Sequence, residues 1–219
     1  MGRLVVIAVA VVLVAIGATW WAVRDVGPQR AATPAPTPTT EPTPAPTPAG
    51  EPAARSRPSR PGCNKSEGRP IDPVSISVPG VVRRAGIVTP PRTVTDVPGT
   101  PPLTEAGKGV FGLDLAQGIR PGDRRGNVLL NAHTWPDGSA LGNRLLTRLD
   151  RGDLIVVHGH GLRLCYRVSE EVEVLASEGL VRYYERAGRH RLAIVVCSGR
   201  RLGPGEWEKR TVWFAAPQA

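Results

Sequence analysis

The stretch Leu192-Ala193-Ile194-Val195-Val196-Cys197-Ser198-Gly199 is an apolar run that ends in a cysteine followed by a Ser-Gly break. Consecutive aliphatic residues bounded by turn residues are typical of a strand buried on both faces. Cys197 therefore stands where this strand leaves the core, a position from which a thiol can face a cleft. A free cysteine is also among the residue types most often buried as inert packing, so this stretch alone allows either interpretation.

Two other strand ends carry chemically active side chains. His133 follows the apolar run Val128-Leu129-Leu130, and Arg210 directly precedes the apolar run Thr211-Val212-Trp213-Phe214-Ala215. A thiolate can attack an acyl carbon, an imidazole can pass a proton to a leaving amine, and a guanidinium can stabilise an oxyanion. Arginine suits the last role because its charge does not titrate away and its planar fork can donate to two oxygens. The sequence therefore predicts a catalytic set of Cys197, His133 and Arg210.

The order of these three residues, their spacing and the Leu-x-x-x-x-Cys strand resemble those of the sortases, the cysteine transpeptidases of Gram-positive cell surfaces. The resemblance covers residues 73–215 and is closest to the class E/F sortases of actinobacteria. It implies an eight-stranded β-barrel in which His133, Cys197 and Arg210 take the places of the family's histidine, nucleophile and arginine. It also implies cleavage of a sorting signal resembling Leu-Pro-x-Thr-Gly (LPXTG) after the threonine, and transfer of the acyl group to a cell-wall amine.

Two positions depart from the sortase pattern. Sortases commonly carry a threonine directly before the nucleophile, where this chain has Val196, and a small or apolar residue two positions before the histidine, where it has Asn131. Around the catalytic set we expect three residues to contact substrate, namely Val196, Thr134 and Trp207. Trp207 lies in a segment expected to be a loop, residues 199–208, and packing on the barrel is an equally good interpretation of it.

The amino-terminal segment predicts a membrane anchor. Residues 4–23 carry no charge and are bounded by Arg3 and Arg24. About 20 apolar residues span a bilayer as a helix, whereas the apolar core of a cleaved signal peptide is shorter. Trp20 and Trp21 mark the end of the run, where indole rings favour the membrane interface. We therefore expect residues 1–25 to form an uncleaved, single-pass transmembrane anchor.

Within residues 26–62, the segment 31–61 alternates proline with threonine and alanine. Such a segment buries too little apolar surface to fold and favours an extended polyproline conformation. At ~3.1 Å per residue, it can hold a domain on the order of 90 Å from a bilayer. We interpret it as a stalk that places a catalytic domain, residues 63–219, on the extracellular side of the cell membrane. A ligand for an SH3-type domain is the alternative.

The rest of the chain predicts an all-β domain. Short apolar or alternating runs are separated by turn residues, a pattern typical of a β-barrel. We expect eight strands, at residues 74–78, 81–88, 127–132, 154–157, 162–168, 171–175, 192–196 and 211–215. The proline-rich residues 89–102 are expected to cross the surface as a long loop.

One helix is expected between the strands. Leu141, Leu145 and Leu149 recur every fourth residue, Ser139 stands before them as a potential N-cap, and Gly152 closes the segment. A short helix after the histidine strand is also what the sortase resemblance implies.

The chain contains three cysteines. If Cys197 is needed as a thiol, Cys63 and Cys165 are the remaining pair, and an extracellular domain lies in an oxidising environment. We therefore predict a disulfide between Cys63 and Cys165 that pins the end of the stalk to the strand 162–168. The alternative is that Cys165 is a buried thiol.

The other histidines do not predict a metal site. His158 and His160 form a His-x-His pair, but zinc needs three or four ligands and no further cluster supplies them. A solvated turn is the better interpretation, and His190 has no partner in sequence. Tyr183 and Tyr184 are expected to cover the barrel. We expect no cofactor and no metal, and no acidic cluster predicts a calcium site.

The formal net charge of +9 and the pI near 10.4 come mostly from arginine. The arginines are not interleaved with exposed aromatic residues and no nucleic-acid motif occurs, so attraction to anionic wall polymers or lipid head groups is the better interpretation. The leading hypothesis is a monomeric transpeptidase that acts on surface proteins bearing a sorting signal. A thiol hydrolase with the same triad, or a non-catalytic wall- or peptide-binding module on the same barrel, are the alternatives.

Overall fold

The computed structural model describes residues 62–64 and 68–218. The predicted anchor and all of the predicted stalk except its last residue lie outside the described residues. Within residues 62–64 and 68–218, no helix is both long enough and apolar enough to cross a membrane.

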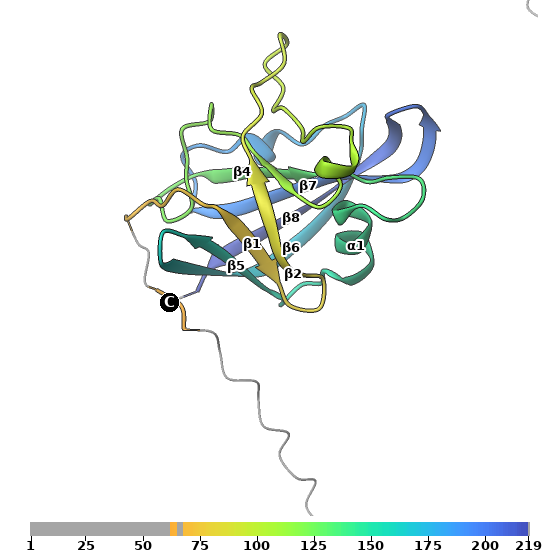
Figure 1. Ribbon diagram of the computed structural model, residues 1–219. Helices are drawn as coiled ribbons and strands as arrows, with labels where there is room; N and C mark the ends of the chain where they lie inside the picture. The colour runs from red at the N-terminus through yellow and green to blue at the C-terminus, as the bar shows by residue number, and fades with distance from the viewer. Residues whose placement is uncertain (1–61, 65–67, 219) are drawn as a thin grey trace, which may run out of the picture. The chain divides into compact units, whose positions relative to one another are not determined.

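The described chain is built almost entirely of strands, with one α-helix and two short 3-10 helices (Figure 1). The elements in chain order are β1 (Ser75–Val78), β2 (Val82–Val88), η1 (Glu105–Gly107), β3 (Phe111–Leu113), β4 (Asn127–Ala132), α1 (Leu141–Arg148), β5 (Leu154–Gly159), β6 (Leu162–Leu175), η2 (Val181–Tyr184), β7 (Arg191–Gly203) and β8 (Glu206–Pro217).

The eight strands close into a barrel in the order β1-β2-β3-β4-β7-β8-β6-β5. Most neighbours are antiparallel, but β2 pairs with β3 and β4 pairs with β7 in parallel. The parallel pair β4–β7 is central to the site, because it brings the ends of two strands that are distant in sequence to the same edge of the barrel. The β7–β8 hairpin extends past the barrel wall, as Figure 1 shows in blue.

Alternation along β7 divides the apolar side chains between two clusters. Leu192, Ile194 and Val196 belong to the cluster that fills the barrel, while Ala193 and Val195 belong to a smaller cluster on the outer face. Successive side chains of a strand point to opposite faces, so a strand covered on both faces appears as a continuous apolar run. The outer cluster also contains Tyr183 of η2, which covers this part of the wall.

The prediction of an eight-stranded barrel is confirmed, but not all eight strands are those expected from the sequence. Residues 162–168 and 171–175 form the single strand β6, with an irregularity between Val168 and Glu170. The strand missed was β3, whose three residues are too short for a periodic signal. Most of the expected loop 199–208 is instead strand, because β7 and β8 continue their pairing almost to the turn.

The helix forms where the leucine spacing predicts it, but its ends differ. Leu141 and Leu145 are buried in the barrel cluster, as is Leu149 just beyond the helix. The N-cap is Ala140, without a side-chain cap, because the Ser139 hydroxyl donates to Asp137 at 2.7 Å instead. The prediction of Ser139 as the cap is therefore wrong. The helix ends at Arg148, well before the predicted stop at Gly152.

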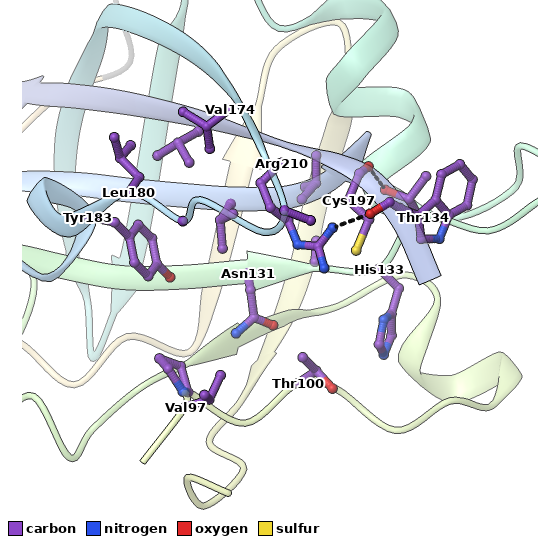
Figure 2. A pocket seen from close by; sticks show the side chains of 18 of the residues that line it. Val97, Thr100, Asn131, His133, Thr134, Val174, Leu180, Tyr183, Cys197 and Arg210 are labelled. Carbon is purple, nitrogen blue, oxygen red and sulfur yellow. Dashed lines mark hydrogen bonds between the residues drawn. The ribbon is translucent and has the colours of Figure 1, made fainter. Parts of the chain in front are cut away.

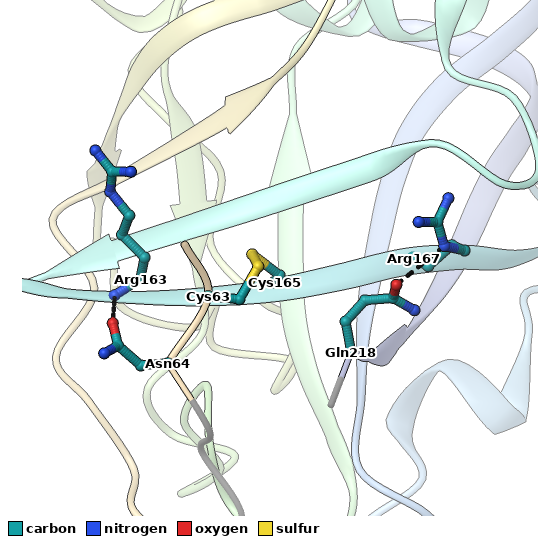
Figure 3. The surroundings of a disulfide bond; sticks show 6 residues. All are labelled: Cys63, Asn64, Arg163, Cys165, Arg167 and Gln218. Atoms are coloured by element: carbon teal, nitrogen blue, oxygen red, sulfur yellow. Dashed lines mark hydrogen bonds between the residues drawn. A yellow bond between two sulfur atoms is a disulfide. The ribbon is translucent and has the colours of Figure 1, made fainter. Parts of the chain in front are cut away.

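The disulfide between Cys63 and Cys165 is present, with the two α-carbons 5.6 Å apart (Figure 3). Beside it, the Asn64 amide donates to the Arg163 carbonyl at 2.8 Å, and the Arg163 amide donates to Asn64 Oδ1 at 2.8 Å. These contacts tie the first described residues to β6. The pairing follows from cysteine parity, whereas the distance that permits it is visible only in the fold.

Candidate active site

Strand register brings the three predicted catalytic residues to one edge of the barrel. Cys197 on β7 and Arg210 on β8 are direct cross-strand partners. On the other side of β7, Ala132 pairs with Val196, so His133 leaves β4 beside the position of Cys197. Directly opposed residues have Cβ atoms about 4.5–5.5 Å apart, close enough for the guanidinium to act on the thiol. Figure 2 shows the three side chains around one pocket.

The pocket is a cavity of about 490 Å³, within the range typical of ligand sites. Its floor is the outer face of β6, β7 and β8, and η2 and residues 97–103 form its walls. The apolar side chains that line it include Val174, Leu180, Tyr183, Val195, Trp207 and Val212. Polar groups are concentrated at the end where Cys197, His133 and Arg210 lie. The cavity therefore combines an apolar groove with one reactive end.

Cys197 is a half-buried free thiol. Burial raises its pKa above the ordinary value of 9.0, and the positive charge of Arg210 opposes that rise. The Thr134 hydroxyl donates to the Cys197 carbonyl at 2.6 Å, which ties the chain after His133 to the nucleophile's own backbone. At neutral pH the resting thiol is therefore protonated, and it needs a base to become a nucleophile.

Arg210 is held by backbone carbonyls. One terminal nitrogen donates to the Lys209 carbonyl at 2.9 Å and to the Trp207 carbonyl at 3.2 Å. Within the described residues no carboxylate pairs with it, so its charge is not neutralised. Figure 2 shows the guanidinium directed toward the thiol, where its remaining N–H groups can donate to an oxyanion.

His133 contacts the loop between β2 and β3. Its Nε2 lies 2.6 Å from the Pro101 carbonyl oxygen. Within the described residues no hydrogen bond joins its ring to Cys197. Catalytic hydrogen bonds are often long in structures without substrate, so this arrangement is compatible with a proton transfer that forms on binding.

The three predicted substrate contacts all border the cavity, in different ways. Trp207, close to the turn of the β7–β8 hairpin, contributes to one wall. Thr134 is buried and its hydroxyl is used by the Cys197 backbone. Val196 is 2% exposed and its side chain belongs to the barrel cluster, so it offers little surface to a substrate. The absence of a threonine at this position therefore removes no group from the groove.

The loop between β2 and β3 forms part of the cavity, a role that its sequence did not indicate. Val97, Pro98, Thr100 and Leu103 line the cavity, whereas this loop was expected only to cross the surface. Its prolines and glycines have no periodicity that indicates a face. Tyr183 was expected to cover the barrel; it does so with its hydroxyl donating to the Leu130 carbonyl at 3.1 Å, and it also lines the cavity.

The other three histidines do not line the cavity. His158 Nε2 lies 2.8 Å from the Ser77 hydroxyl, and His160 occupies the β5–β6 turn with φ of 42°. His190 is buried beside Tyr166, so it has a partner that its sequence neighbours did not reveal. In the described ranges no group of three or more His, Cys, Asp or Glu is placed to hold a metal ion.

The closed eight-stranded barrel carries a thiol, an imidazole and a guanidinium at neighbouring strand ends, the three groups that acyl transfer by a cysteine nucleophile uses. Comparison with solved structures identifies the barrel more closely: this chain has the sortase fold. Sortase C1 from Streptococcus suis matches with a TM-score of 0.50 and 15% identity, over 67% of this chain and 73% of that chain. Sortase C1 from Streptococcus agalactiae matches with a TM-score of 0.50 and 15% identity, over 70% and 72%.

Sortase A from Corynebacterium diphtheriae is similar to the same degree, with a TM-score of 0.50 and 17% identity over 68% of this chain and 62% of that chain. No protein-family model matches this chain, and no curated protein matches it. At these identities the likeness establishes the fold. The reaction depends on the residues at the site.

Proposed function

We propose that this protein is a membrane-anchored cysteine transpeptidase of the sortase type. The observation that supports it most is the strand register, which pairs Cys197 with Arg210 and places His133 beside them at the end of an apolar groove. A barrel can be stable without these three side chains, and core packing does not require a half-buried thiol beside an unneutralised guanidinium.

The reaction follows from the three groups. His133 accepts the proton of the Cys197 thiol, and the thiolate attacks the carbonyl carbon of the scissile threonine. The carbonyl oxygen becomes an oxyanion that accepts hydrogen bonds from Arg210. His133 then returns the proton to the leaving amine, which frees the glycine-side peptide and leaves a thioester on Cys197. An acceptor amine attacks the thioester and regenerates the thiol.

The proposed substrate is a surface protein that carries an LPXTG-like signal. The apolar lining of Val174, Leu180 and Val212 suits the leucine and proline of such a signal, and the reactive end of the groove suits its threonine-glycine bond. The proposed acceptor is a cell-wall amine, and the proposed sortase class is class E/F. With residues 4–23 as a single-pass anchor, a monomeric catalytic domain acts outside the cell membrane of a Gram-positive bacterium.

A second candidate is a peptide-binding module on the same barrel that does no chemistry. It is favoured by the resting geometry, in which the thiol has a raised pKa and His133 is bonded to Pro101 instead of Cys197. Such a module binds the signal peptide in the groove and leaves it intact. A hydrolase with the same triad would differ only in its acceptor, which is water.

Mass analysis of peptide products separates these functions. The full chain is incubated with an LPXTG peptide, with and without an added amine, and Cys197→Ala is the control. Either enzyme forms a thioester on Cys197, but with the added amine a transpeptidase releases an amine-linked product, whereas a hydrolase releases only the free acid. An intact peptide after long incubation with a folded wild-type chain would refute the enzymatic proposal.

A further inference from the structure

We propose that the loop of residues 89–103, here called the Pro101 loop, positions His133 by holding it in one tautomer. In this arrangement Nε2 carries the hydrogen and donates to the Pro101 carbonyl, which leaves Nδ1 for proton exchange with the thiol and the leaving amine. Asn131 and the Arg92–Asp114 ion pair are positioning residues that hold the loop. This inference rests on the proposed function, since it assigns the loop a role in that proton transfer.

The tautomer follows from the contact itself. The Nε2 atom of His133 and the carbonyl oxygen of Pro101 are 2.6 Å apart. A carbonyl oxygen can only accept a hydrogen bond, so the hydrogen lies on Nε2. In a neutral imidazole the other nitrogen then has the lone pair, which makes Nδ1 the only ring atom able to take a proton from Cys197.

Asn131 ties the loop to β4 just before the histidine. Its side-chain amide donates to the Gly99 carbonyl at 2.8 Å, and the residue is 6% exposed. Gly99 fits closely against the rest of the loop, since a Cβ there would lie 2.2 Å from the Pro91 carbonyl oxygen. Asn131 is one of the two departures from the sortase pattern, and this hydrogen bond provides a physical reason for an amide at that position.

An ion pair between the half-buried Arg92 and the buried Asp114 holds the beginning of the same loop. Arg92 donates to one oxygen of Asp114 from two nitrogens, at 2.5 and 3.0 Å, and Asp114 is 1% exposed. A third nitrogen of Arg92 donates to Asp96 within the loop at 3.0 Å. Asp114 directly follows β3, so the pair joins the loop to the barrel. Removing one partner of a buried pair leaves an uncompensated charge, so the loop is expected to shift when Arg92 is lost.

Loss of these contacts is predicted to act on proton transfer. A ring that is no longer held by Pro101 can adopt the opposite tautomer, in which Nδ1 carries the hydrogen and cannot accept one from the thiol. General acid–base catalysis typically contributes about 10²–10⁴ in rate, so a partly misplaced tautomer should cost roughly tenfold or more. The expected signature is a changed pH profile together with a lower rate, rather than weaker peptide binding alone.

The test measures the tautomer directly on the full chain. Nitrogen-15 NMR of the His133 ring distinguishes the two tautomers, and the pH dependence of Cys197 acylation is measured in parallel. The variants are Asn131→Ala, Arg92→Ala and Arg92→Lys, which keeps the charge facing Asp114. The control is Arg120→Ala, which removes an arginine paired with Asp72, and neither of these residues lines the pocket. We expect the Nε2–H tautomer in the wild type and the control, a mixture in the two alanine variants, and a partial return in Arg92→Lys.

An Nδ1–H tautomer in the wild type would overturn the inference. An unchanged tautomer and pH profile in folded Asn131→Ala would also overturn it, whether or not Arg92→Ala folds. The NMR measurement needs no substrate, so its outcome is independent of the proposed function. A wild-type chain with the expected tautomer but no acylation would count against the transpeptidase and not against the positioning of the ring.

Discussion

The two ends of the parallel pair β4–β7 each carry a histidine, and the two histidines have different surroundings. His133 follows β4 at the end where Cys197 lies, and it borders an open cavity. His190 precedes β7 at the opposite end and is 7% exposed. Its Nε2 accepts from the Gly122 amide at 3.2 Å and lies 3.0 Å from the Tyr166 hydroxyl. One ring remains accessible for chemistry, whereas the other is packed into the barrel.

The comparison shows that a histidine beside a buried strand acquires its role from segments distant in sequence. Burial lowers the pKa of His190 and keeps it neutral, so it serves as a structural hydrogen-bonding group. His133 contacts a loop that also forms the pocket wall. Changes at the cavity end should therefore reduce activity and leave stability nearly unchanged, and changes at the opposite end should do the reverse.

The largest effect on activity is expected from Cys197→Ala. This variant should lose acyl-enzyme formation completely, because no other group in the cavity is placed as a nucleophile beside Arg210. Mass analysis after incubation with an LPXTG peptide measures the acylated fraction, and urea unfolding checks that the fold is retained. An acyl adduct on the alanine variant would show that the nucleophile lies elsewhere.

Arg210→Ala should be folded and nearly inactive. Loss of one oxyanion donor typically costs about 10²–10³ in turnover, and Arg210→Lys should recover only part because it lacks the planar fork. Arg200→Ala and Arg201→Ala, in the exposed part of the β7–β8 hairpin, are the matched controls and should stay close to wild type. If Arg201 proves to be the indispensable arginine, the assignment of Arg210 is wrong.

Away from the cavity, the largest effect on stability is expected from the disulfide. The bridge joins residues 102 positions apart, and removal of a native disulfide typically costs ~2–4 kcal/mol. Cys63→Ser should lower the free energy of unfolding by about this amount, measured by urea unfolding, and leave acylation at low temperature unchanged. Thiol counting on the denatured, non-reduced wild type should find one reactive cysteine. A count of three would show that the bridge does not form.

His190→Gln should have a smaller effect that depends on pH. Because burial lowers the pKa of His190, the unfolded chain binds a proton more readily near the ordinary value of 6.5. Its contribution to stability is therefore present above that pH and is lost as the pH falls through and below it. Urea unfolding between pH 8 and 5 should show a weaker pH dependence for His190→Gln than for His160→Gln, the turn control. Equal slopes would contradict a buried, neutral His190.

Local sequence determined those parts of this protein that follow from the spacing of apolar residues and from the number of cysteines. The bounds of β4 were predicted correctly because an apolar run with turn signals on each side defines a buried strand. The run ending at Cys197 predicted the core of β7, and the leucine spacing located α1. Cysteine parity predicted the Cys63–Cys165 bridge. The resemblance to the sortases at Cys197, His133 and Arg210 predicted an eight-stranded barrel, although it did not give the register of the strands.

The tertiary structure alone decided the rest, because contacts distant in sequence leave no periodic signal. β3 exists because β2 and β4 pair with it, and Asp137 rather than the helix takes the Ser139 hydroxyl. The inward direction of Val196 follows from the register of β7 in the closed barrel. The partners of His190 come from β6 and from the segment before β4, and the Pro101 contact of His133 comes from the loop between β2 and β3. Which histidine faces the cavity is therefore a property of the closed barrel and its loops, not of the residues adjacent to either histidine.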